Sequence, residues 1–350
     1  MRMRDPIAAS RPRVSFVVTN FNYANYIERA VDSLLGQRGV DLELIVIDDR
    51  STDDSRAILQ RYADEPRVRL LFHERNRGNI YSYNEGLALA RGDIVGTFDA
   101  DDVCLRPDVV ARQVAMFDAH PEVGLVYTGF AIVDETDRPF RESKPWTSDH
   151  VRPAYEAFGD LLSLNTVPHS GALVRRSCHD VVGWYDPRLS YAGDWDLWLR
   201  LAGRFAVGYL AGPLYAYRVH RNNMTSRGTP PGKATRERVQ AVENAFAALP
   251  PDAPAAVRDL RVPARRNALL TGTWNDRSFG RTRRSWVGLG DALRRSPDLL
   301  LQRALYSAVA HLLVLTAIGH PRYERLASWR ESRGRRSLST PAGSRIAHDR

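Results

Sequence analysis

Short apolar runs alternate with amphipathic stretches along the first hundred residues of the chain. The apolar runs are residues 14–19, 42–47, 68–72 and 94–98. Runs of this length that end in polar turn residues are typical of buried strands. Between them, apolar side chains recur at three- and four-residue steps, as in helices. The predicted helices are residues 26–35, 55–63 and 81–90. This alternation predicts an α/β fold with a doubly wound, mostly parallel sheet.

The pattern continues less regularly to about residue 220. It predicts strands at residues 123–127 and 170–175, an extended polar stretch at 134–153 and a helix at 194–202. A turn-rich linker at residues 227–232 precedes further predicted helices. We therefore expect four regions. They are a flexible N-terminus (1–12), an α/β domain (13–228), a helical basic C-terminal appendage (229–333) and a disordered tail (334–350).

The charge of the chain is distributed unevenly. The formal net charge is +9, but residues 221–350 hold 24 Lys and Arg against 10 Asp and Glu. The first 220 residues are acidic, with 26 against 31. A basic segment can contact nucleic acid or an anionic membrane, or it can be a solvated arginine-rich surface. The segment contains no recognisable nucleic-acid-binding module, so we expect no nucleic-acid partner.

Cysteine content and hydropathy indicate a cytoplasmic location. Cys104 and Cys178 are the only cysteines, and they form neither a disulfide framework nor a zinc motif. The N-terminus has no apolar segment typical of a signal peptide. The apolar residues 299–318 are interrupted by Gln302, Arg303 and His311, so we do not expect a membrane span. With the surrounding arginines, they could instead lie peripherally on the inner membrane face, or pack as an ordinary helix.

Three carboxylates follow the fourth apolar run directly. They are Asp99, Asp101 and Asp102, in an Asp-x-Asp (DXD) pattern. Carboxylate oxygens are hard ligands that suit Mg²⁺ or Mn²⁺. Acidic turns after strands are common, so this pattern alone is weak evidence for a metal site. The motifs that accompany it give it weight.

Several motifs occur in order around this cluster. They are Ser15-Phe-Val-Val-Thr-Asn-Phe-Asn22, Ile45-Val-Ile-Asp-Asp-Arg-Ser-Thr-Asp-Asp54, Asn76-Arg-Gly78, the Asp99 cluster and Gly193-Asp-Trp-Asp196. In combination they resemble glycosyltransferase family 2, whose catalytic domain has the GT-A fold. The resemblance covers roughly residues 13–220. It implies an inverting transferase that moves one sugar from a nucleotide-diphosphate sugar, UDP- or dTDP-linked, to a glycan or a lipid-linked acceptor, as in polysaccharide and cell-envelope biosynthesis.

The resemblance also implies a donor site. Its expected residues are Thr19, Phe21, Asp48, Asp49, Arg77, Asn84 and Asp99. Thr19 and Phe21 would line the nucleotide pocket, and Asp49 would accept a hydrogen bond from the base. Asp48 is its neighbour and could exchange roles with it. Helix capping is the alternative use of the two aspartates.

Metal and base assignments follow from the same resemblance. Asp99 would meet the ribose or a metal-bound water, Asp101 would bind the metal and Asp102 would compete with it as a ligand. His220 would complete the shell of a Mn²⁺ or Mg²⁺ ion that offsets the charge of the leaving diphosphate. Asp194, at the start of its predicted helix, would be the catalytic base that activates the acceptor hydroxyl. Its alternative use is an N-cap.

Two other functions compete with sugar transfer. A nucleotidyltransferase would need a Gly-rich, Lys-bearing loop near the N-terminus, and residues 14–26 contain none. A transferase-like domain without activity could serve as a binding or scaffold protein. The presence of all the expected aspartates speaks against this inactive alternative. The sequence also has no apolar run that could form a transmembrane channel, so we do not expect a processive, membrane-embedded synthase.

Overall fold

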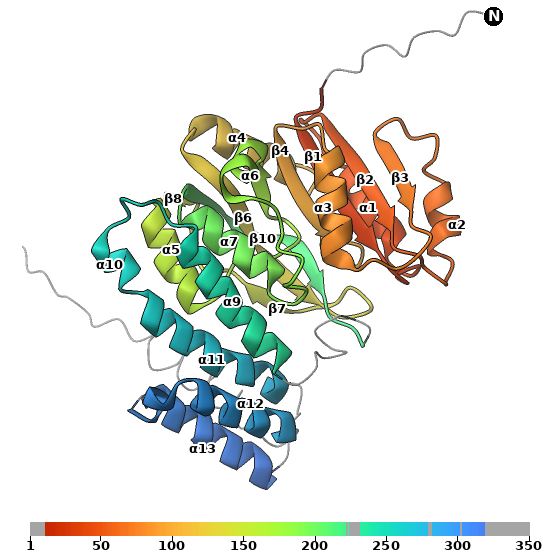
Figure 1. The fold of residues 1–350 in the computed structure, drawn as a ribbon. Coiled ribbons are helices and arrows are strands. Elements are labelled where there is room, and N and C mark those ends of the chain that lie inside the picture. Colours follow the sequence, from red (N-terminus) through yellow and green to blue (C-terminus); the bar gives the residue numbers. More distant parts are fainter. Residues whose placement is uncertain (1–10, 222, 224–231, 279–281, 302, 319–350) are drawn as a thin grey trace, which may run out of the picture. The chain divides into compact units, whose positions relative to one another are not determined.

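The computed structural model describes residues 11–221, 223, 232–278, 282–301 and 303–318 (Figure 1). The chain divides into two compact units, Met1–Ala268 and Leu269–Arg350. The strands are β1 Val14–Asn20, β2 Leu42–Asp48, β3 Val68–Phe72, β4 Ile94–Asp99, β5 Val103–Cys104, β6 Val123–Val133, β7 Pro139–Ser143, β8 His150–Arg152, β9 Leu173–Arg175 and β10 Ala206–Arg218.

Helices make up most of the remaining described chain. Those that begin in the first unit are α1 Ile27–Leu35, α2 Ser55–Gln60, α3 Asn79–Leu89, α4 Val109–Ala119, α5 Ala154–Ser163, α6 Arg176–Val182, α7 Gly193–Ala202, α9 Lys233–Ala247, α10 Ala255–Arg258 and α11 Arg261–Ser278. The second unit contains α12 Thr282–Arg295, the short 3₁₀ helix η1 Pro297–Leu301 and α13 Arg303–Ile318.

One large mixed sheet forms the centre of the first unit. Its strand order is β3-β2-β1-β4-β9-β6-β10-β5, with β7 beside β6 and β8 beside β10. Strands β3, β2, β1 and β4 run parallel, as do β6 and β10. Strand β9 is antiparallel to both of its neighbours, β4 and β6. The prediction of a doubly wound, mostly parallel α/β sheet is therefore confirmed.

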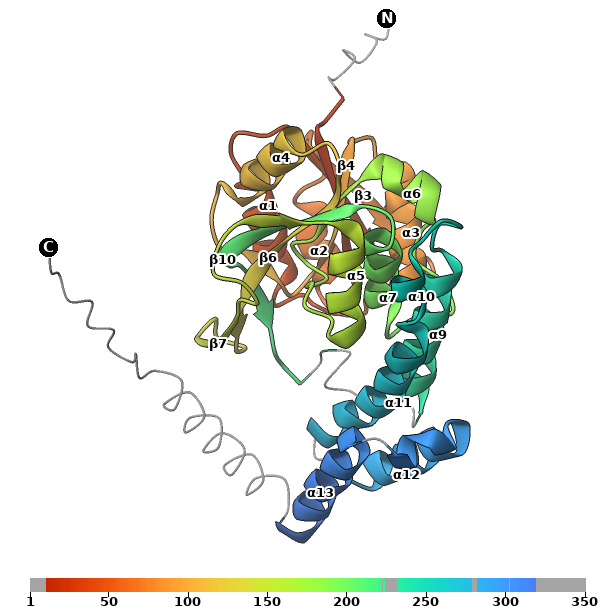
Figure 2. The ribbon, with the colours of Figure 1, turned by 90° about the vertical axis from the view of Figure 1, so that its left-hand side faces the viewer.

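Helices cover both faces of this sheet, and each face has its own apolar core. One core joins the sheet to α1 and α4, and the other joins it to α3, α5, α7 and α9. Figure 2 shows α1 and α4 on one side of the sheet and α3, α6 and α7 on the other. Every residue of β1 and of β2 is buried, because a strand covered on both faces has no side exposed to water.

The predicted elements match the observed ones most closely in the parallel half of the sheet. Helix α1 buries Ile27, Ala30, Val31 and Leu34, four of the five apolar positions that predicted it, and the fifth, Leu35, is half-buried. The polar stretch at residues 134–153 contains the short strands β7 and β8, which pair with β6 and β10. The predicted strand at residues 170–175 is shorter, Leu173–Arg175.

The first compact unit extends beyond the domain end expected from the sequence. It reaches Ala268 and so includes α9 and α10. Helix α9 packs against α7 in Figure 1 and shares its apolar core. The boundary at residue 228 stays a prediction for the end of the GT-A domain. The predicted disordered tail, 334–350, lies outside the described residues, as does most of the predicted flexible N-terminus.

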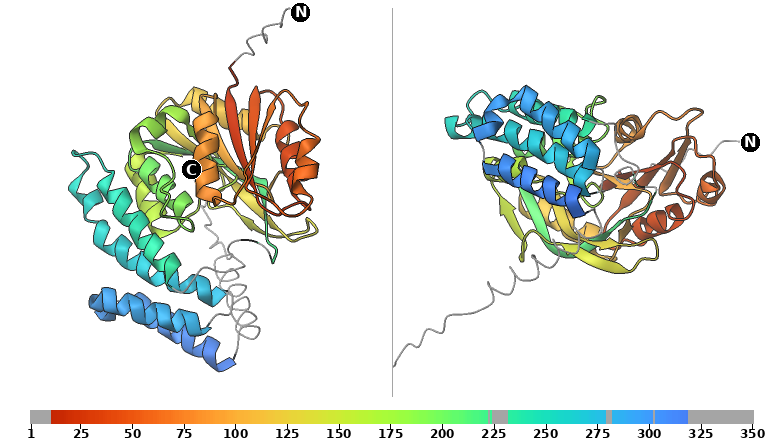
Figure 3. Two further views of the ribbon diagram at one scale, coloured as in Figure 1. Left: turned by 45° about the vertical axis from the view of Figure 1, so that its right-hand side comes forward. Right: turned by 90° about the horizontal axis from the view of Figure 1, so that it is seen from below.

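In the described part of the second unit, helices α12 and α13 lie side by side. Helices α12 and α13 form a hairpin through η1 (Figure 3). The Trp286 indole donates a hydrogen bond to the Thr316 hydroxyl at 3.1 Å. The inner face of α13 buries Leu305, Ala308, Leu312 and Leu315. None of the helices described in the chain is both long enough and apolar enough to cross a bilayer.

Gly171 is expected to be essential for the path of the chain into β9. Its φ is +89°, and an added Cβ would lie 2.4 Å from the ring of Tyr215. We expect Gly171→Ala to lower the free energy of unfolding by about 2–4 kcal/mol, through strain and overpacking together. Gly78→Ala is the matched control, because Gly78 has φ +87° but open space around its Cβ. It should cost only about 1–2 kcal/mol. Equal losses in urea unfolding would contradict the overpacking.

Candidate active site

The parallel strands β1, β2 and β4 bring distant polar residues to one edge of the sheet. Asn20 at the end of β1 pairs with Asp48 at the end of β2. On the other side of β1, Thr19 pairs with Asp99 at the end of β4. Ligands bind at the carboxyl ends of strands in open α/β sheets. The register therefore places most of the predicted donor residues along one edge.

Asp48 is fully buried and held by three neighbours. Its carboxylate accepts hydrogen bonds from the Asn20 amide at 2.9 Å, the Ser51 backbone at 2.9 Å and the Arg56 guanidinium at 2.8 Å. Burial alone raises the pKa of Asp48, but the hydrogen bonds from Ser51, Arg56 and Asn20 outweigh it and hold the pKa below its usual value. This geometry fastens the end of β2 to the end of β1.

Asp49 organises the loop that precedes α3. Its two oxygens accept hydrogen bonds from the backbone of Arg77 at 2.7 Å and of Gly78 at 2.8 Å. His73 lies between Asp49 and Glu85, at 2.8 and 2.6 Å. Burial alone lowers the pKa of His73, yet its two carboxylate partners raise it above its usual value. The contact between Asp49 and a nucleotide base stays a prediction.

The Arg77 side chain stacks on Tyr81, whose ring lies beside His73 of this network. Its guanidinium lies over the ring of Tyr81, 3.5 Å from the centroid. Phe21, just after β1, is 37% exposed, and Thr19 is buried. Asn84 bonds both the backbone N–H and the carbonyl of Tyr185, at 3.1 and 2.9 Å. The structure therefore shows Asn84 joining α3 to the segment before α7, whereas the donor contacts of these residues stay predictions.

Asp99 is bound on two sides by groups that the sequence did not indicate. Its carboxylate accepts a hydrogen bond from the Tyr83 hydroxyl, and His169 Nδ1 lies 3.0 Å from its other oxygen. The opposite ring nitrogen of His169 contacts the Thr97 hydroxyl at 2.9 Å. Burial alone raises the pKa of Asp99, but the neighbouring His169 and the Tyr83 hydroxyl hold it below its usual value.

Asp101 and His220, two of the predicted metal ligands, are in direct contact, and their binding of a metal stays a prediction. His220 Nε2 lies 3.0 Å from Asp101 Oδ2, and the Asn223 amide donates to the same oxygen at 2.9 Å. His220 packs against Tyr23 and Tyr26, with ring centroids 5.4 and 4.8 Å apart. Both side chains are buried, and 119 residues separate them in the sequence.

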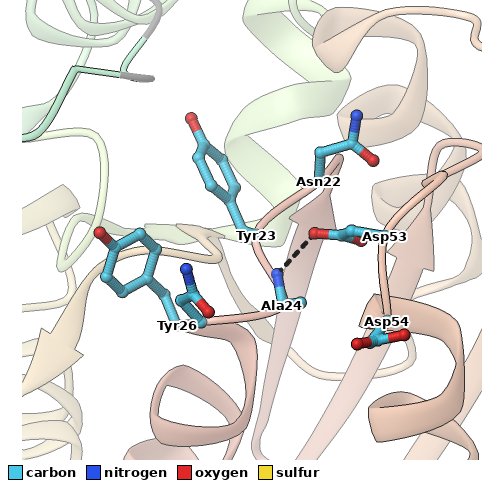
Figure 4. Close-up of a pocket in the computed structure, with 7 residues that line it drawn as sticks. Asn22, Tyr23, Ala24, Tyr26, Asp53 and Asp54 are labelled. Atoms are coloured by element: carbon cyan, nitrogen blue, oxygen red, sulfur yellow. Dashed lines mark hydrogen bonds between the residues drawn. The ribbon is translucent and has the colours of Figure 1, made fainter.

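A polar pocket of about 260 Å³ lies beside the start of α1. Its lining residues are Asn22, Tyr23, Ala24, Asn25, Tyr26, Asp53 and Asp54. Figure 4 shows the Tyr23 and Tyr26 rings on one side and the two aspartates on the other. Asp53 accepts a hydrogen bond from the Ala24 backbone at 2.9 Å. Because Tyr23 and Tyr26 also contact His220, the pocket adjoins the Asp101–His220 pair.

Asp102 is turned toward the backbone of β10. It accepts a hydrogen bond from the Arg218 N–H at 3.0 Å, and burial raises its pKa well above the usual value. The Arg218 guanidinium is buried as well and binds the Asp101 and Asp134 carbonyls and the Asp137 carboxylate. This cluster holds β10 against the turn after β4. Among the described residues, no three or more His, Cys, Asp or Glu side chains are grouped to hold a metal ion.

Asp194 lies at the start of α7, where the sequence predicted a helix to begin. Gly193 is the first residue of this helix. The Asn165 amide donates to the Asp194 carboxylate at 3.3 Å. Burial raises the pKa of Asp194 above its usual value, and nearby His169 and Arg238 partly oppose this rise. The role of Asp194 as a base stays a prediction, but its carboxylate is close enough to His169 to interact electrostatically with it.

Three site residues were missed in the sequence: His73, Tyr83 and His169. Each is a single polar residue outside any spaced motif, so no local pattern indicated it. His169 lies in Pro168-His-Ser-Gly171, immediately before β9. Only the pairing of β9 with β4 reveals that this segment returns to Asp99. The position of His169 could have been predicted only from this long-range strand pairing, which a single sequence does not reveal.

Known proteins resemble this chain in sequence and in fold. Residues 15–183 match the family model described as glycosyl transferase family 2. Over this segment the chain is similar to that family. The succinoglycan biosynthesis protein ExoO of Rhizobium meliloti is 41% identical over 117 residues, which cover 33% of each protein. The chain spans between 26% and 54% of the length of the first curated relatives it matches.

Solved structures show the same fold as the family 2 domain. TarS 1–349 of S. aureus, in complex with UDP-GlcNAc, aligns with a TM-score of 0.65 at 19% identity, over 91% of this chain and 92% of TarS 1–349. The mannosyltransferase PcManGT of Pyrobaculum calidifontis, in complex with GDP-Man and Mn²⁺, aligns with a TM-score of 0.54 at 19% identity, over 90% and 89%. At these identities the likeness shows a shared GT-A fold.

We expect Asp48→Asn to lower the free energy of unfolding by about 1.5–3 kcal/mol near neutral pH, because it removes hydrogen bonds to a charged group. A carboxyl whose pKa is lowered by folding stabilises the protein above its ordinary pKa of 3.8 and loses that effect as the pH falls further. The difference between wild type and variant should therefore shrink below that pH. Urea unfolding from about pH 7 to about pH 3 measures it, with Asp118→Asn as the exposed control. A constant difference would contradict the assignment.

Proposed function

We propose that this protein is an inverting glycosyltransferase that moves one sugar from a nucleotide-diphosphate sugar to an acceptor hydroxyl with the help of a divalent metal. The match of residues 15–183 to glycosyl transferase family 2 supports transferase activity. The observation that carries the proposal is the direct contact between Asp101, just after β4, and His220, just after β10, with Asp194 on a separate helix. Donor and base would thus be held by different parts of the fold.

The donor chemistry of Asp101 and His220 fits Mn²⁺ or Mg²⁺. A carboxylate oxygen and an imidazole nitrogen already meet there at 3.0 Å. Asp99 is bonded to Tyr83 and His169, and Asp102 to the Arg218 backbone, which favours Asp101 and His220 as the protein's ligands. A set of two protein ligands suits a metal ion that keeps its other coordination positions for phosphate oxygens and water. When bound, such an ion would offset negative charge on the leaving diphosphate.

Asp194 is suited to take the proton from the acceptor hydroxyl. A general base is most effective when its pKa approaches the working pH, and burial moves the pKa of Asp194 in that direction. The Asn165 amide orients one of its oxygens. A single base opposite the leaving group gives direct displacement, and hence inversion at the anomeric carbon.

The relatives suggest the substrate class. TarS is described in complex with UDP-GlcNAc, and PcManGT in complex with GDP-Man and Mn²⁺. ExoO is described as a protein of succinoglycan biosynthesis. For this chain we propose a UDP- or dTDP-sugar donor and a glycan or lipid-linked acceptor, within polysaccharide and cell-envelope biosynthesis in the cytoplasm.

A nucleotide panel tests the donor site. We expect one nucleoside diphosphate to stabilise the wild type in the presence of Mn²⁺ or Mg²⁺, by about 2.7 kcal/mol at one hundred times its Kd. Thermal unfolding and calorimetry should both detect this effect, and chelator should abolish it. Asp101→Ala should lose the response because it removes the carboxylate that we assign to the metal. Asp118→Ala, an exposed carboxylate paired with Arg13, is the control and should keep it.

The panel also separates the transferase from its main rival. A scaffold protein with a transferase fold would show no metal-dependent response to any nucleotide. A response that persists unchanged in Asp101→Ala would refute the proposed metal site while leaving nucleotide binding intact. Release of the diphosphate from the matching nucleotide-sugar then tests turnover.

We also propose that the second unit contacts an anionic membrane surface, where a lipid-linked acceptor would lie. The outward face of α13 exposes Tyr306, Ala310, Leu313, Val314 and Ala317, which follow helical spacing. Leu313 is 56% exposed and Tyr306 62%. The region around this apolar stripe is strongly basic, with 24 Lys and Arg against 10 Asp and Glu in residues 221–350. An apolar stripe within a basic region suits an anionic bilayer surface.

We expect the wild type to sediment with phosphatidylglycerol-containing vesicles at low salt and to be released at high salt. Leu313→Asp should weaken this binding about tenfold or more, because it places a carboxylate in the apolar stripe. Val262→Asp on α11 is the matched control, since Val262 is 57% exposed but lies outside the stripe. Retention of the wild type in the supernatant would refute the membrane contact. So would a change of oligomeric state in Leu313→Asp without any change in vesicle binding.

A further inference from the structure

Helix α9 lies beyond the segment that matches the family model, yet it binds the chain on both sides of the start of α7. Lys233, Glu237 and Asn244 share one face of α9, because their spacing of four and then seven residues follows the helical period. All three point polar groups at the segment before α7 or at its first turn. Asp194 lies in that turn.

Glu237 makes the most specific of these contacts. Its side chain is buried, and its Oε2 atom accepts hydrogen bonds from the backbone N–H of Tyr191 at 2.6 Å and of Ala192 at 3.1 Å. Ala192 is the residue that precedes α7, in the N-cap position, and an alanine has no side-chain acceptor for such a position. In a capping box, a glutamate of the same helix accepts the N-cap N–H. Here Glu237 does so from a different helix.

The other two residues hold the flanks of this contact. The Lys233 ammonium donates to the Ser190 hydroxyl at 2.7 Å. The Asn244 amide donates to Asp196 at 2.8 Å and to Asp186 at 3.0 Å. Together they hold the chain from before the turn to the second residue after Asp194. The helix start on which Asp194 lies is therefore held in place from α9.

We propose that Glu237 is a positioning residue for sugar transfer, which caps α7 from α9 and so sets the place of the Asp194 carboxylate. This inference rests on the proposed role of Asp194 as the base. Asp194 follows the capped residue Ala192 by two positions, so a shift in the first turn moves its carboxylate relative to the donor. A misplacement of about 1 Å at a catalytic group can lower the rate about a hundredfold.

Two substitutions separate the cap from the charge. Glu237→Ala removes the acceptor, and we expect kcat to fall about 10- to 100-fold while the affinity for the nucleoside diphosphate stays unchanged. Glu237→Gln keeps a carbonyl oxygen for the same N–H groups and should retain most of the activity. Glu243→Gln is the matched control on α9, since Glu243 pairs only with Arg261 and Arg265 among the described contacts. The assay is release of UDP from UDP-GlcNAc, or of the diphosphate that the nucleotide panel selects.

A double-mutant cycle with Asp194→Asn tests whether Glu237 acts through Asp194. We expect Glu237→Ala to lower kcat in the wild-type background and to change it less than about twofold in the Asp194→Asn background. Hydrogen exchange gives a readout that needs no substrate. The amides of Tyr191 and Ala192 should exchange faster in Glu237→Ala than in Glu237→Gln, because only the alanine variant leaves them without an acceptor.

The possible results are distinguishable. If Asp194→Asn leaves kcat unchanged, the base assignment fails and the proposed mechanism with it. If Asp194→Asn lowers kcat but Glu237→Ala does not, the inference alone is overturned. An equal effect of Glu237→Ala in both backgrounds also overturns it, because Glu237 would then act elsewhere. If Glu237→Ala does not fold, Glu237→Gln replaces it in the test. The inference is then overturned if folded Glu237→Gln loses as much activity as Asp194→Asn while its amide exchange is unaltered.

Discussion

The structure depends on satisfying several carboxylates that are buried at one edge of a sheet. Asp48, Asp49, Asp101 and Asp102 are almost inaccessible to water. A buried charge without partners costs several kcal/mol, so each of them needs nearby hydrogen-bond donors. Backbone N–H groups bind Asp49 and Asp102, whereas Asp48 combines a backbone N–H with an amide and a guanidinium. At Asp101 the partners that the structure describes include two side chains, His220 and Asn223, which a ligand could rearrange more readily than backbone N–H groups.

The parallel half of the fold was predictable because its information is local. A buried parallel strand is an uninterrupted apolar run, and the helices that cover it carry apolar residues at helical spacing. Residues 14–19 and 42–47 were predicted as strands and form β1 and β2 almost to the residue. Since parallel strands end at the same edge, the position of Asp48, Asp49 and Asp99 along that edge followed from the strand assignments.

The partners of those carboxylates could not be predicted in the same way. His169 reaches Asp99 across 70 residues, and His220 reaches Asp101 across 119. His220 was proposed through the family resemblance, whereas nothing local distinguished His169 from a structural histidine. Its position depends on β9 running antiparallel between β4 and β6, which the apolar pattern does not reveal. Long-range strand pairing thus determines which side chains contact the carboxylates at the strand ends.

The site is therefore assembled from two kinds of support that can vary independently. Asp99 is the last residue of β4, and Asp101 lies in the turn that follows, where His220 and Asn223 hold it. Asp194 lies in the first turn of α7, which has no side-chain cap of its own. The Glu237 carboxylate of α9 accepts the hydrogen bond of the N-cap residue instead. Helix ends have unpaired N–H groups that must find an acceptor, so capping from another helix couples the two helices. Changes in α9 can then shift Asp194, the proposed base, without disturbing the proposed donor residues. A C-terminal segment outside the matched family region would in this way affect the proposed reaction.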